Sequence, residues 1–425
     1  MTTPEACKFR TWLPVAPSSQ STAKKHSFTV MTYNILCQKL IRRTLFPYAN
    51  KTCLKRKQRN SKLLSEISHW KPDIACMQEV ETEYWHTAMH PHLRRSNYES
   101  RFFQSLAKSH GVSISWKKQK FHIIDEVNVS MDISMEVNGE RLNTDNVALI
   151  TVLGYGPGDE ALDPYADSVD PEYQIGTPKP DDAEEGGVIV STAHLFWKPN
   201  ACYERLQQQH AVMKALMELK AKYPGFHIIA CGDYNTTPDD AGYDLLTKPR
   251  PVRLSEEQLE NLLPYSVEAG DDEDDEEADD DRPPAMSYAS VVAGSNDSST
   301  ELKLLEEERR LDAQLQQDIA RVNSLVDLFQ TSYEPLRSAY GNYVDLDPTY
   351  KTPQWEGEPI YTNYAKWKGT LDYIFFGVAQ QGGKSSRLAL RDVLGLPPVK
   401  RLNPGLPNDL FPSDHVSLMA RFAAD

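Results

Sequence analysis

Polar residues follow several apolar, β-branched-rich stretches of this chain at the point where each stretch stops. Such positions are held by Asn34, Glu79, His194, Asp233 and Asn235, and the set is completed by Asp372 in Gly-Thr-Leu-Asp-Tyr-Ile and by Asp414 and His415 in Pro-Ser-Asp-His. Residues at strand ends can converge on one edge of a sheet although they are far apart in sequence. Carboxylates, amides and imidazoles that converge without thiols are typical of a site for a hard cation such as Mg²⁺ and a phosphate group.

The carboxylates and one amide of this set predict a metal site. Glu79 is the principal candidate ligand, since a carboxylate at the end of a buried strand is otherwise costly. Asn34 can ligate the metal or hold its water, and Asp414 is a further candidate ligand. Asp233 can accept a proton from an attacking water or bind a second ion. We expect one or two Mg²⁺ ions, which Mn²⁺ can replace.

The remaining polar residues are suited to a phosphate group that is attacked by water. Asn235, in Gly-Asp-Tyr-Asn, can donate to the scissile phosphate. His415, when protonated, can bind a phosphate oxygen, and Asp372 can accept its other ring N–H. Each residue also has a structural alternative, because Asn and Asp favour turns and caps and a histidine such as His194 can be buried and satisfied. The recurrence of these residue types at six strand ends favours the catalytic interpretation.

Charge along the chain is uneven. The formal net charge is −15, but residues 271–281 hold ten acidic side chains, and removing these leaves −5. Six Lys and Arg residues fall within 51–62, and three Lys residues within 117–120. Either basic cluster can meet a phosphate backbone or form a solvated helix face.

Bulk properties bound the class of protein. The 425 residues are 40% hydrophobic, with no apolar run long enough to cross a bilayer, so we expect no membrane partner. Six cysteines occur without a CxxC pair, which favours a reducing compartment, cytoplasmic or nuclear. The first 27 residues lack a secretory signal but are basic and rich in Ser and Thr, which is compatible with a mitochondrial address.

Hydrophobic periodicity predicts a layered α/β fold of two packed sheets with helices on the outer faces. The predicted strands cover residues 28–33, 73–78, 111–116, 147–153, 188–193, 226–231, 371–376 and 417–422. The predicted helices cover residues 51–70 and 203–223.

Composition divides the chain further. We predict a flexible leader at residues 1–26, a catalytic domain at 27–425 and a disordered acidic insertion at 268–300, with another long loop at 159–185. Residues 301–322 predict a highly charged helix, whose leucines can pack on the domain and whose surface can bind a protein partner.

Longer motifs support a family resemblance. They are Met-Thr-Tyr-Asn-Ile-Leu from Met31, Thr-Ala-His-Leu-Phe-Trp-Lys-Pro from Thr192, Tyr-Thr-Asn-Tyr from Tyr361, and Phe-Pro-Ser-Asp-His from Phe411. The chain resembles the endonuclease/exonuclease/phosphatase superfamily, and within it the deadenylase–nocturnin–Angel branch with its Ngl-type RNA exonucleases.

The resemblance implies a DNase-I-like two-sheet sandwich and a Mg²⁺-dependent, monomeric enzyme. Such an enzyme shortens RNA from a free 3′ end, releases 5′-mononucleotides and either prefers poly(A) or processes ribosomal RNA. It also implies that the polar set above forms the catalytic ring. Pro199 and Trp367 match the walls that bind a base, with Trp367 where those enzymes commonly have phenylalanine, and Phe411 is a further candidate substrate contact. A core position is the alternative for Trp367.

Two other classes of function remain open. The same ring in related proteins acts as a phosphatase or phosphodiesterase on small nucleotides such as 2′,5′-oligoadenylate or NADP(H). A non-catalytic binding protein would require a damaged ring, whereas every expected residue is present.

Overall fold

The computed structural model describes most of the chain. The described residues are 3–15, 26–131, 136–137, 140–141, 143–156, 186–263, 298–377, 379–381, 384–386 and 388–424. The predicted loop at 159–185 and residues 268–297 of the predicted insertion lie outside them.

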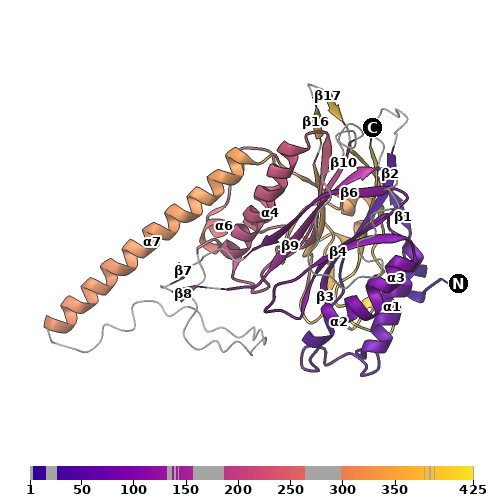
Figure 1. Ribbon diagram of the computed structural model, residues 1–425. Coiled ribbons are helices and arrows are strands. Elements are labelled where there is room, and N and C mark those ends of the chain that lie inside the picture. Colours follow the sequence, from indigo (N-terminus) through magenta and orange to yellow (C-terminus); the bar gives the residue numbers. More distant parts are fainter. Residues whose placement is uncertain are drawn as a thin grey trace.

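Two mixed sheets form the centre of the fold (Figure 1). The first sheet has the order β1 (Trp12–Pro14), β18 (Leu388–Leu394), β19 (Leu418–Ala424), β2 (His26–Asn34), β3 (Ile74–Glu81), β5 (His110–Lys117) and β4 (Tyr98–Phe103). The second has the order β12 (Arg337–Ser338), β15 (Asp372–Gly377), β11 (Phe226–Asp233), β10 (Gly187–His194), β9 (Val147–Tyr155) and β6 (Phe121–Ser130). All eight predicted strands are present, so the predicted two-sheet architecture is confirmed.

Side chains that alternate along each strand separate the core into layers. In β2, Val30 joins the cluster between the sheets, whereas Met31 faces the outer cluster beside Leu63 and Ile67 of α1 (Arg56–Trp70). This alternation follows from the two-residue period of a strand. Both faces of each sheet are therefore covered, which explains the nearly continuous burial of the central strands.

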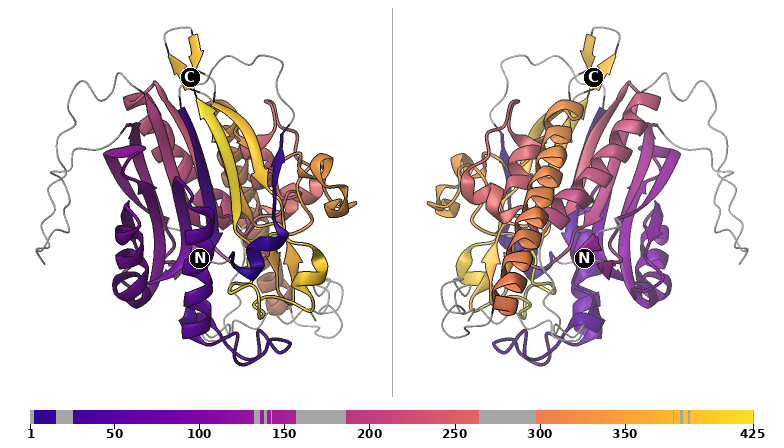
Figure 2. Two further views of the ribbon diagram at one scale, coloured as in Figure 1. Left: turned by 90° about the vertical axis from the view of Figure 1, so that its right-hand side faces the viewer. Right: turned by 90° about the vertical axis from the view of Figure 1, so that its left-hand side faces the viewer.

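Helices cover the outer faces, as predicted. The helix α1 and the shorter α2 (Thr82–Tyr84) and α3 (His90–Arg95) lie on the side of the first sheet (Figure 1). On the side of the second sheet, α4 (Cys202–Lys222) and α7 (Ser298–Ser332) lie next to each other (Figure 2). The shorter helices are α5 (Ala241–Thr247), α6 (Glu256–Asn261), α8 (Tyr343–Leu346) and α9 (Val399–Leu402), with 3₁₀ or π turns at Glu5–Phe9, Gln38–Leu40, Trp85–Met89 and Pro348–Tyr350. No described helix combines the length and apolar content that a bilayer span requires.

Small two-stranded ribbons complete the described fold. They pair β13 (Asn363–Tyr364) with β14 (Lys368–Gly369), β16 (Ala379–Gln381) with β17 (Lys384–Ser386), and β7 (Glu136–Val137) with β8 (Glu140–Arg141). The first of these matters for the site, because Asn363 also forms an isolated bridge with His415.

The prediction of a flexible leader over residues 1–26 is wrong for residues 3–15. Strand β1 pairs with β18, with Trp12 opposite Leu394. The Arg10 guanidinium is buried and donates from Nε to Gly395 O at 2.8 Å and from Nη2 to Ser417 O at 2.6 Å. These two partners lie 385 and 407 residues further along the chain, so the local composition gave no sign of this anchor.

The predicted charged helix is present and longer than expected. Helix α7 contains residues 301–322 and continues to Ser332. The expected packing of its leucines is wrong for Leu311 and Leu315, which are 45% and 43% exposed. The C-terminal part holds the helix instead, since Val322 and Phe329 are buried against the second sheet and its helices.

Candidate active site

Pairing within the sheets brings the predicted site residues to neighbouring strand ends. In the second sheet His194 of β10 pairs with Asp233 of β11, and Asp233 pairs with Asp372 of β15. In the first sheet Asn34 of β2 is the partner of Gln78, directly before Glu79. Both ends belong to the same edge of the sandwich, because a side-chain hydrogen bond of 2.9 Å joins Asn34 Nδ2 to Asp233 Oδ2.

Glu79 lies at an irregularity of strand β3. The register with β5 shifts between Met77 and Val80, and Glu79 has a φ of 55°. A non-glycine residue with positive φ is uncommon, and such strain is often held at functional sites. The bulge places the carboxylate near Asn34 Nδ2, at 2.8 Å, and near the backbone N–H of Cys37, also at 2.8 Å.

The surroundings of Glu79 favour its ionised form. Burial alone would raise the pKa of this carboxyl. The His194 and His110 imidazoles and the two hydrogen-bond donors outweigh burial, so the pKa of Glu79 lies below its ordinary value. An ionised, buried carboxylate with two oxygens is a suitable ligand for a hard cation.

Asn34 connects the two sheets through its side-chain amide. Its Nδ2 donates to Glu79 Oε1 and to Asp233 Oδ2, while its Oδ1 accepts from Leu36 N at 3.0 Å. In this arrangement the amide nitrogen, not the oxygen, points toward the carboxylates. Asn34 therefore joins Glu79 and Asp233 through one amide nitrogen, and its predicted role as a metal ligand or as a holder of the metal's water stays a prediction.

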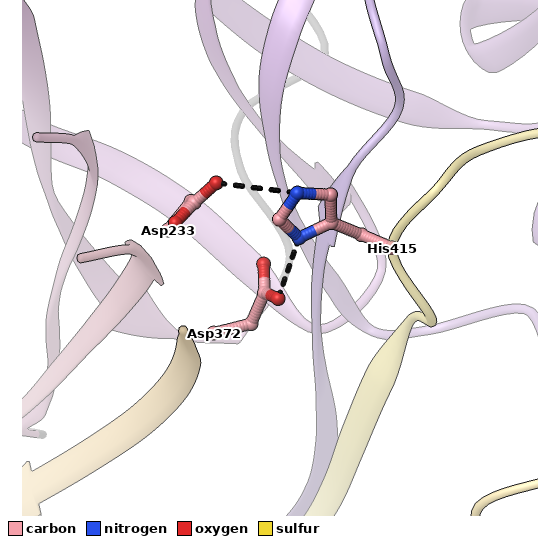
Figure 3. Close-up of side chains that lie close together, drawn as sticks. All are labelled: Asp233, Asp372 and His415. Carbon is pink, nitrogen blue, oxygen red and sulfur yellow. Dashed lines mark hydrogen bonds and ion pairs between the residues drawn. The ribbon is translucent and has the colours of Figure 1, made fainter. Parts of the chain in front are cut away.

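His415 is held between two carboxylates (Figure 3). Its Nδ1 lies 2.7 Å from Asp372 Oδ2, and its Nε2 lies 3.6 Å from Asp233 Oδ2. Burial disfavours the imidazolium, but Asp372 and Asp233 outweigh it and raise the pKa of His415 well above its ordinary value. Thr362 Oγ1 donates to Asp372 Oδ2 at 2.7 Å and fixes that carboxylate. The predicted pairing of Asp372 with His415 is present.

The other predicted catalytic residues lie around this centre. His194 Nε2 is 3.7 Å from Asp233 Oδ2, and burial lowers the pKa of His194. Burial raises the pKa of Asp233 and raises that of Asp414 to about 6. Asn235, with a φ of 46°, donates its side-chain N–H to Leu195 O at 2.9 Å, so this amide also fixes the loop after His194.

Two groups of ligand atoms can receive a cation. Asp233, Asp372 and His415 offer ligand atoms that lie within 4.8 Å of one another. In that group Asp372 is already committed to orienting His415. The pair of Glu79 and Asp233, which share the Asn34 amide, better matches the carboxylate ligands that Mg²⁺ uses.

The predicted substrate contacts have different positions. Pro199 and Trp367 are exposed, Trp367 by 52%, so the core alternative for Trp367 is wrong. The predicted contact by Phe411 is wrong, since its side chain is only 1% exposed and belongs to the core between the sheets. Its place in a loop next to Ser413 gave no sign of that burial.

Some residues near the site were not predicted from the sequence. His110 begins β5 opposite Glu81, has a buried Nδ1 without a hydrogen-bond partner among the described residues, and interacts electrostatically with Glu79. Thr362 contacts Asp372 as described above. The only signal for His110 was its place directly before a predicted strand. The sequence did not show that this strand runs antiparallel to β3.

The basic clusters contain members with structural roles. Arg59 is buried and donates to Ile35 O and Pro412 O at 2.6 Å each, which ties together the loops that follow Asn34 and precede Ser413. Arg59 is therefore neither exposed on a solvated helix face nor available to contact a nucleic acid. In the second cluster Lys117 and Lys120 pair with Asp73 at 2.8 and 2.9 Å.

Sequence comparisons relate the chain to a family of enzymes that hydrolyse phosphoric esters. The Endonuclease/Exonuclease/phosphatase family model matches residues 31–415. The protein named "Probable RNA exonuclease NGL3" from Saccharomyces cerevisiae is 30% identical over 82% of this chain and 64% of its own length. "RNA exonuclease NGL2" from the same yeast is 25% identical, over 92% of this chain and 77% of its length. The chain thus spans slightly less than two thirds of the NGL3 protein.

Solved structures resemble the fold at low identity. ANGEL2, described as a 2′,3′-cyclic phosphatase, has a TM-score of 0.59 at 20% identity, with 97% of each chain covered. The human Nocturnin catalytic domain has a TM-score of 0.53 at 18% identity, with 100% of both chains covered. These similarities establish the architecture of the sandwich.

Proposed function

Because this chain belongs to the endonuclease/exonuclease/phosphatase family, we propose that it is a Mg²⁺-dependent RNA exonuclease that works from the 3′ end and releases 5′-mononucleotides. The observation that carries the proposal is the Asn34 amide, which holds Glu79 and Asp233 together beside the His415–Asp372 pair. RNA as the substrate is supported by the yeast relatives that are named RNA exonucleases.

Glu79 is the proposed principal ligand of the metal, with Asp233 and Asp414 as further oxygen donors. The site fits this role because Glu79 is ionised, buried and accepts hydrogen bonds from two N–H groups. When bound, Mg²⁺ supplies neutralisation of negative charge on the phosphate oxygens.

His415 is the proposed phosphate-binding cation of the protein. The raised pKa keeps the imidazole protonated at neutral pH, and Asp372 fixes the ring through Nδ1. The Nε2–H on the opposite side then points toward Asp233 and is available to a phosphate oxygen. A donor fixed in advance stabilises the developing charge without reorganisation.

Asp233 is the proposed acceptor of the proton from the attacking water. Its Oδ2 lies near His194, His415 and Asn34, and burial raises its pKa, which makes it a better base than an exposed carboxylate. His194, whose pKa burial lowers although Asp233 and Glu79 oppose this, can donate a ring N–H to the same phosphate.

Pro199 and Trp367 are the proposed contacts for the terminal base. Both are exposed, and Trp367 lies on the hairpin of β13 and β14, whose Asn363 bridges to His415. Stacking on an aromatic face tolerates every base, so the broader indole ring favours weak base preference.

Product analysis on defined RNA tests the proposal. Purified protein is incubated with poly(A), poly(U) and a mixed-sequence RNA labelled at the 5′ end, each with a free 3′-hydroxyl and Mg²⁺. We expect a ladder that shortens from the 3′ end and 5′-mononucleotides by chromatography. A 3′-phosphorylated RNA and an EDTA sample serve as controls.

Two outcomes would contradict the proposal. Intact RNA at high enzyme concentration, together with release of AMP from 2′,5′-oligoadenylate or of inorganic phosphate from NADP(H), would assign the site to a small-nucleotide phosphodiesterase or phosphatase. Absence of turnover on both substrate classes would favour a binding protein.

A further inference from the structure

Trp197 is a large aromatic side chain that stays in contact with water beside the site. It is 40% exposed and follows the catalytic residue His194 by three positions, in the loop between β10 and α4. Full burial of an aromatic side chain stabilises a fold by several kcal/mol. A partly exposed indole such as Trp197 stabilises the fold by less than a buried one.

The start of this loop is fixed by side chains from two other elements. Asn235 Nδ2 donates to Leu195 O at 2.9 Å. Phe196 N donates to Gln208 Oε1 of α4 at 2.8 Å. The backbone on the N-terminal side of Trp197 therefore cannot move without breaking buried hydrogen bonds.

The C-terminal side of the loop is fixed by one arginine. Arg205, buried in α4, donates from Nη1 to Lys198 O and from Nη2 to Pro199 O at 2.8 Å. Asp240 Oδ2 lies 3.5 Å from Arg205 Nη2 and balances the charge. Trp197 is thus held between two fixed backbone segments although its own ring is exposed.

The indole itself has one aromatic neighbour among the described ring pairs. The Phe196 ring is buried, with its centroid 6.4 Å from that of Trp197 and the two planes inclined at 66°. An edge contact of this kind orients the indole and leaves ring surface accessible to a ligand. Lys198 and the exposed Pro199 follow directly, so a positive charge accompanies the aromatic face.

We propose that Trp197 is a stacking platform for a second RNA base, on the 5′ side of the bond that is hydrolysed. This inference rests on the proposed function, in which Pro199 and Trp367 hold the terminal base and every remaining base lies 5′ to the scissile phosphate. Single-stranded nucleic acid is bound by a combination of aromatic platforms and basic side chains. A fixed loop lowers the ordering cost of binding, which is the advantage of a platform built in advance.

Binding without turnover tests the platform. The background is Glu79→Gln, so that RNA is not consumed, and the ligand is a 5′-fluorescein oligo(A) of eight nucleotides measured by anisotropy. We expect Trp197→Ala to raise the Kd about 5- to 150-fold, the range for loss of one stacked base. Trp197→Phe should recover part of the affinity, because an aromatic face remains.

Abasic substitution identifies the base that stacks. The same RNA is prepared with one abasic residue at the second, third or fourth nucleotide from the 3′ end. At one of these positions the Glu79→Gln protein should bind the abasic RNA with nearly the same Kd whether or not it also carries Trp197→Ala, because the base that stacks is already missing. Leu259→Ala removes an exposed leucine on α6 and is the matched control, with an unchanged Kd for every RNA.

Two results would overturn the platform. The first is a Kd for intact RNA that Trp197→Ala leaves unchanged. The second is a Kd that Trp197→Ala raises by the same factor for all three abasic RNAs, which indicates a general structural effect. Thermal denaturation and near-ultraviolet circular dichroism of Trp197→Phe separate a folding defect from a binding defect. Failure of the proposed exonuclease activity is distinguishable from failure of the platform. It appears in product analysis and does not change how the Kd for RNA depends on Trp197 and on the abasic position.

Discussion

The His415 imidazole contacts Asp372 and Asp233 from opposite ring nitrogens, at 2.7 and 3.6 Å. The three residues come from β15, from β11 and from the loop before β19, so both sheets contribute to the arrangement (Figure 3). Two carboxylates beside one imidazole stabilise its protonated form. This relationship gives the site a cation that belongs to the protein itself.

Replacement of Asp372 by Asn should shift the alkaline limb of the pH–rate profile to lower pH. Asp372 raises the pKa of His415, so loss of its charge lowers that pKa and the imidazolium is lost at a lower pH. The profile of kcat/KM against pH checks this shift in the free enzyme.

His415→Ala should lower kcat about 10²–10³-fold, the scale of one lost transition-state donor.

Thr362→Ser is a matched control for this shift. A serine hydroxyl can still donate to Asp372 Oδ2, as Thr362 does at 2.7 Å, so the alkaline limb should stay in place. An Asp372→Asn profile that only decreases in height, without moving along the pH axis, would contradict the role of Asp372 in setting the pKa.

Replacement of Glu79 by Gln should lower activity by at least about 10²-fold and weaken Mg²⁺ binding while the protein stays folded. The glutamine keeps the shape of the side chain, and its one oxygen can still accept from either Asn34 Nδ2 or Cys37 N, which donate to separate oxygens of Glu79. Mg²⁺ titration by calorimetry and turnover assays, each with an EDTA sample, check the two effects separately.

Glu81→Gln provides the comparison for Glu79. Glu81 lies two residues further along the same strand, is also buried and pairs with Arg56 at 2.9 Å. Its replacement should leave the Mg²⁺ affinity unchanged. An equal loss of affinity in both variants would show that general negative charge, and not the Glu79 carboxylate, attracts the ion.

Replacement of Gly369 by Ala should disturb Trp367. A Cβ at position 369 would lie 2.1 Å from an indole carbon of Trp367, and Gly369 does not have a positive φ, so only the indole must move. We expect Gly369→Ala to raise the KM for RNA, as we expect of Trp367→Ala. The double variant should be no worse than Trp367→Ala alone, whereas additive effects would contradict this contact.

Replacement of Glu358 by Gln should remove a pH dependence of stability. Burial raises the pKa of Glu358 from 4.5 to about 7, while Tyr243 Oη donates to its Oε1 at 2.8 Å. Between pH 4.5 and 7 the unfolded chain has lost this proton and the folded protein retains it, so stability falls as pH rises. The slope from this group is at most about 1.4 kcal/mol per pH unit. Denaturant unfolding across this range, compared with Glu358→Gln, measures it.

Replacement of Arg10 by Met should destabilise the fold by about 3–5 kcal/mol, because Glu66 is left as a buried, unpaired charge. Arg10 Nη1 lies 3.4 Å from Glu66 Oε1, and both side chains are almost fully buried. Thermal unfolding checks the loss, and Arg10→Met with Glu66→Gln should recover part of it. Lys8→Met removes the exposed partner of Glu5 and should cost at most about 1 kcal/mol.

The sequence by itself determined eight strands of the sandwich and the chemistry at their ends, whereas β1, β4, β6, β12 and β18 were not predicted. Alternating or continuous apolar stretches located every predicted strand, because the burial pattern of a strand is written in its own residues. The same stretches marked Glu79 and Asp233 as polar residues at the end of an apolar run, and the predicted Asp372–His415 pair is present.

Tertiary structure decided what each side chain contacts. Arg59 belonged to a cluster predicted to be solvated or to bind nucleic acid, and Arg10 to the predicted flexible leader, yet both are buried and bind backbone carbonyls far along the chain. Phe411 appeared accessible and is in the core, and Asn34 turned its amide nitrogen toward two carboxylates. Local patterns record which residues are buried in an element, whereas the partner of a polar group depends on strand order and register, which distant residues set.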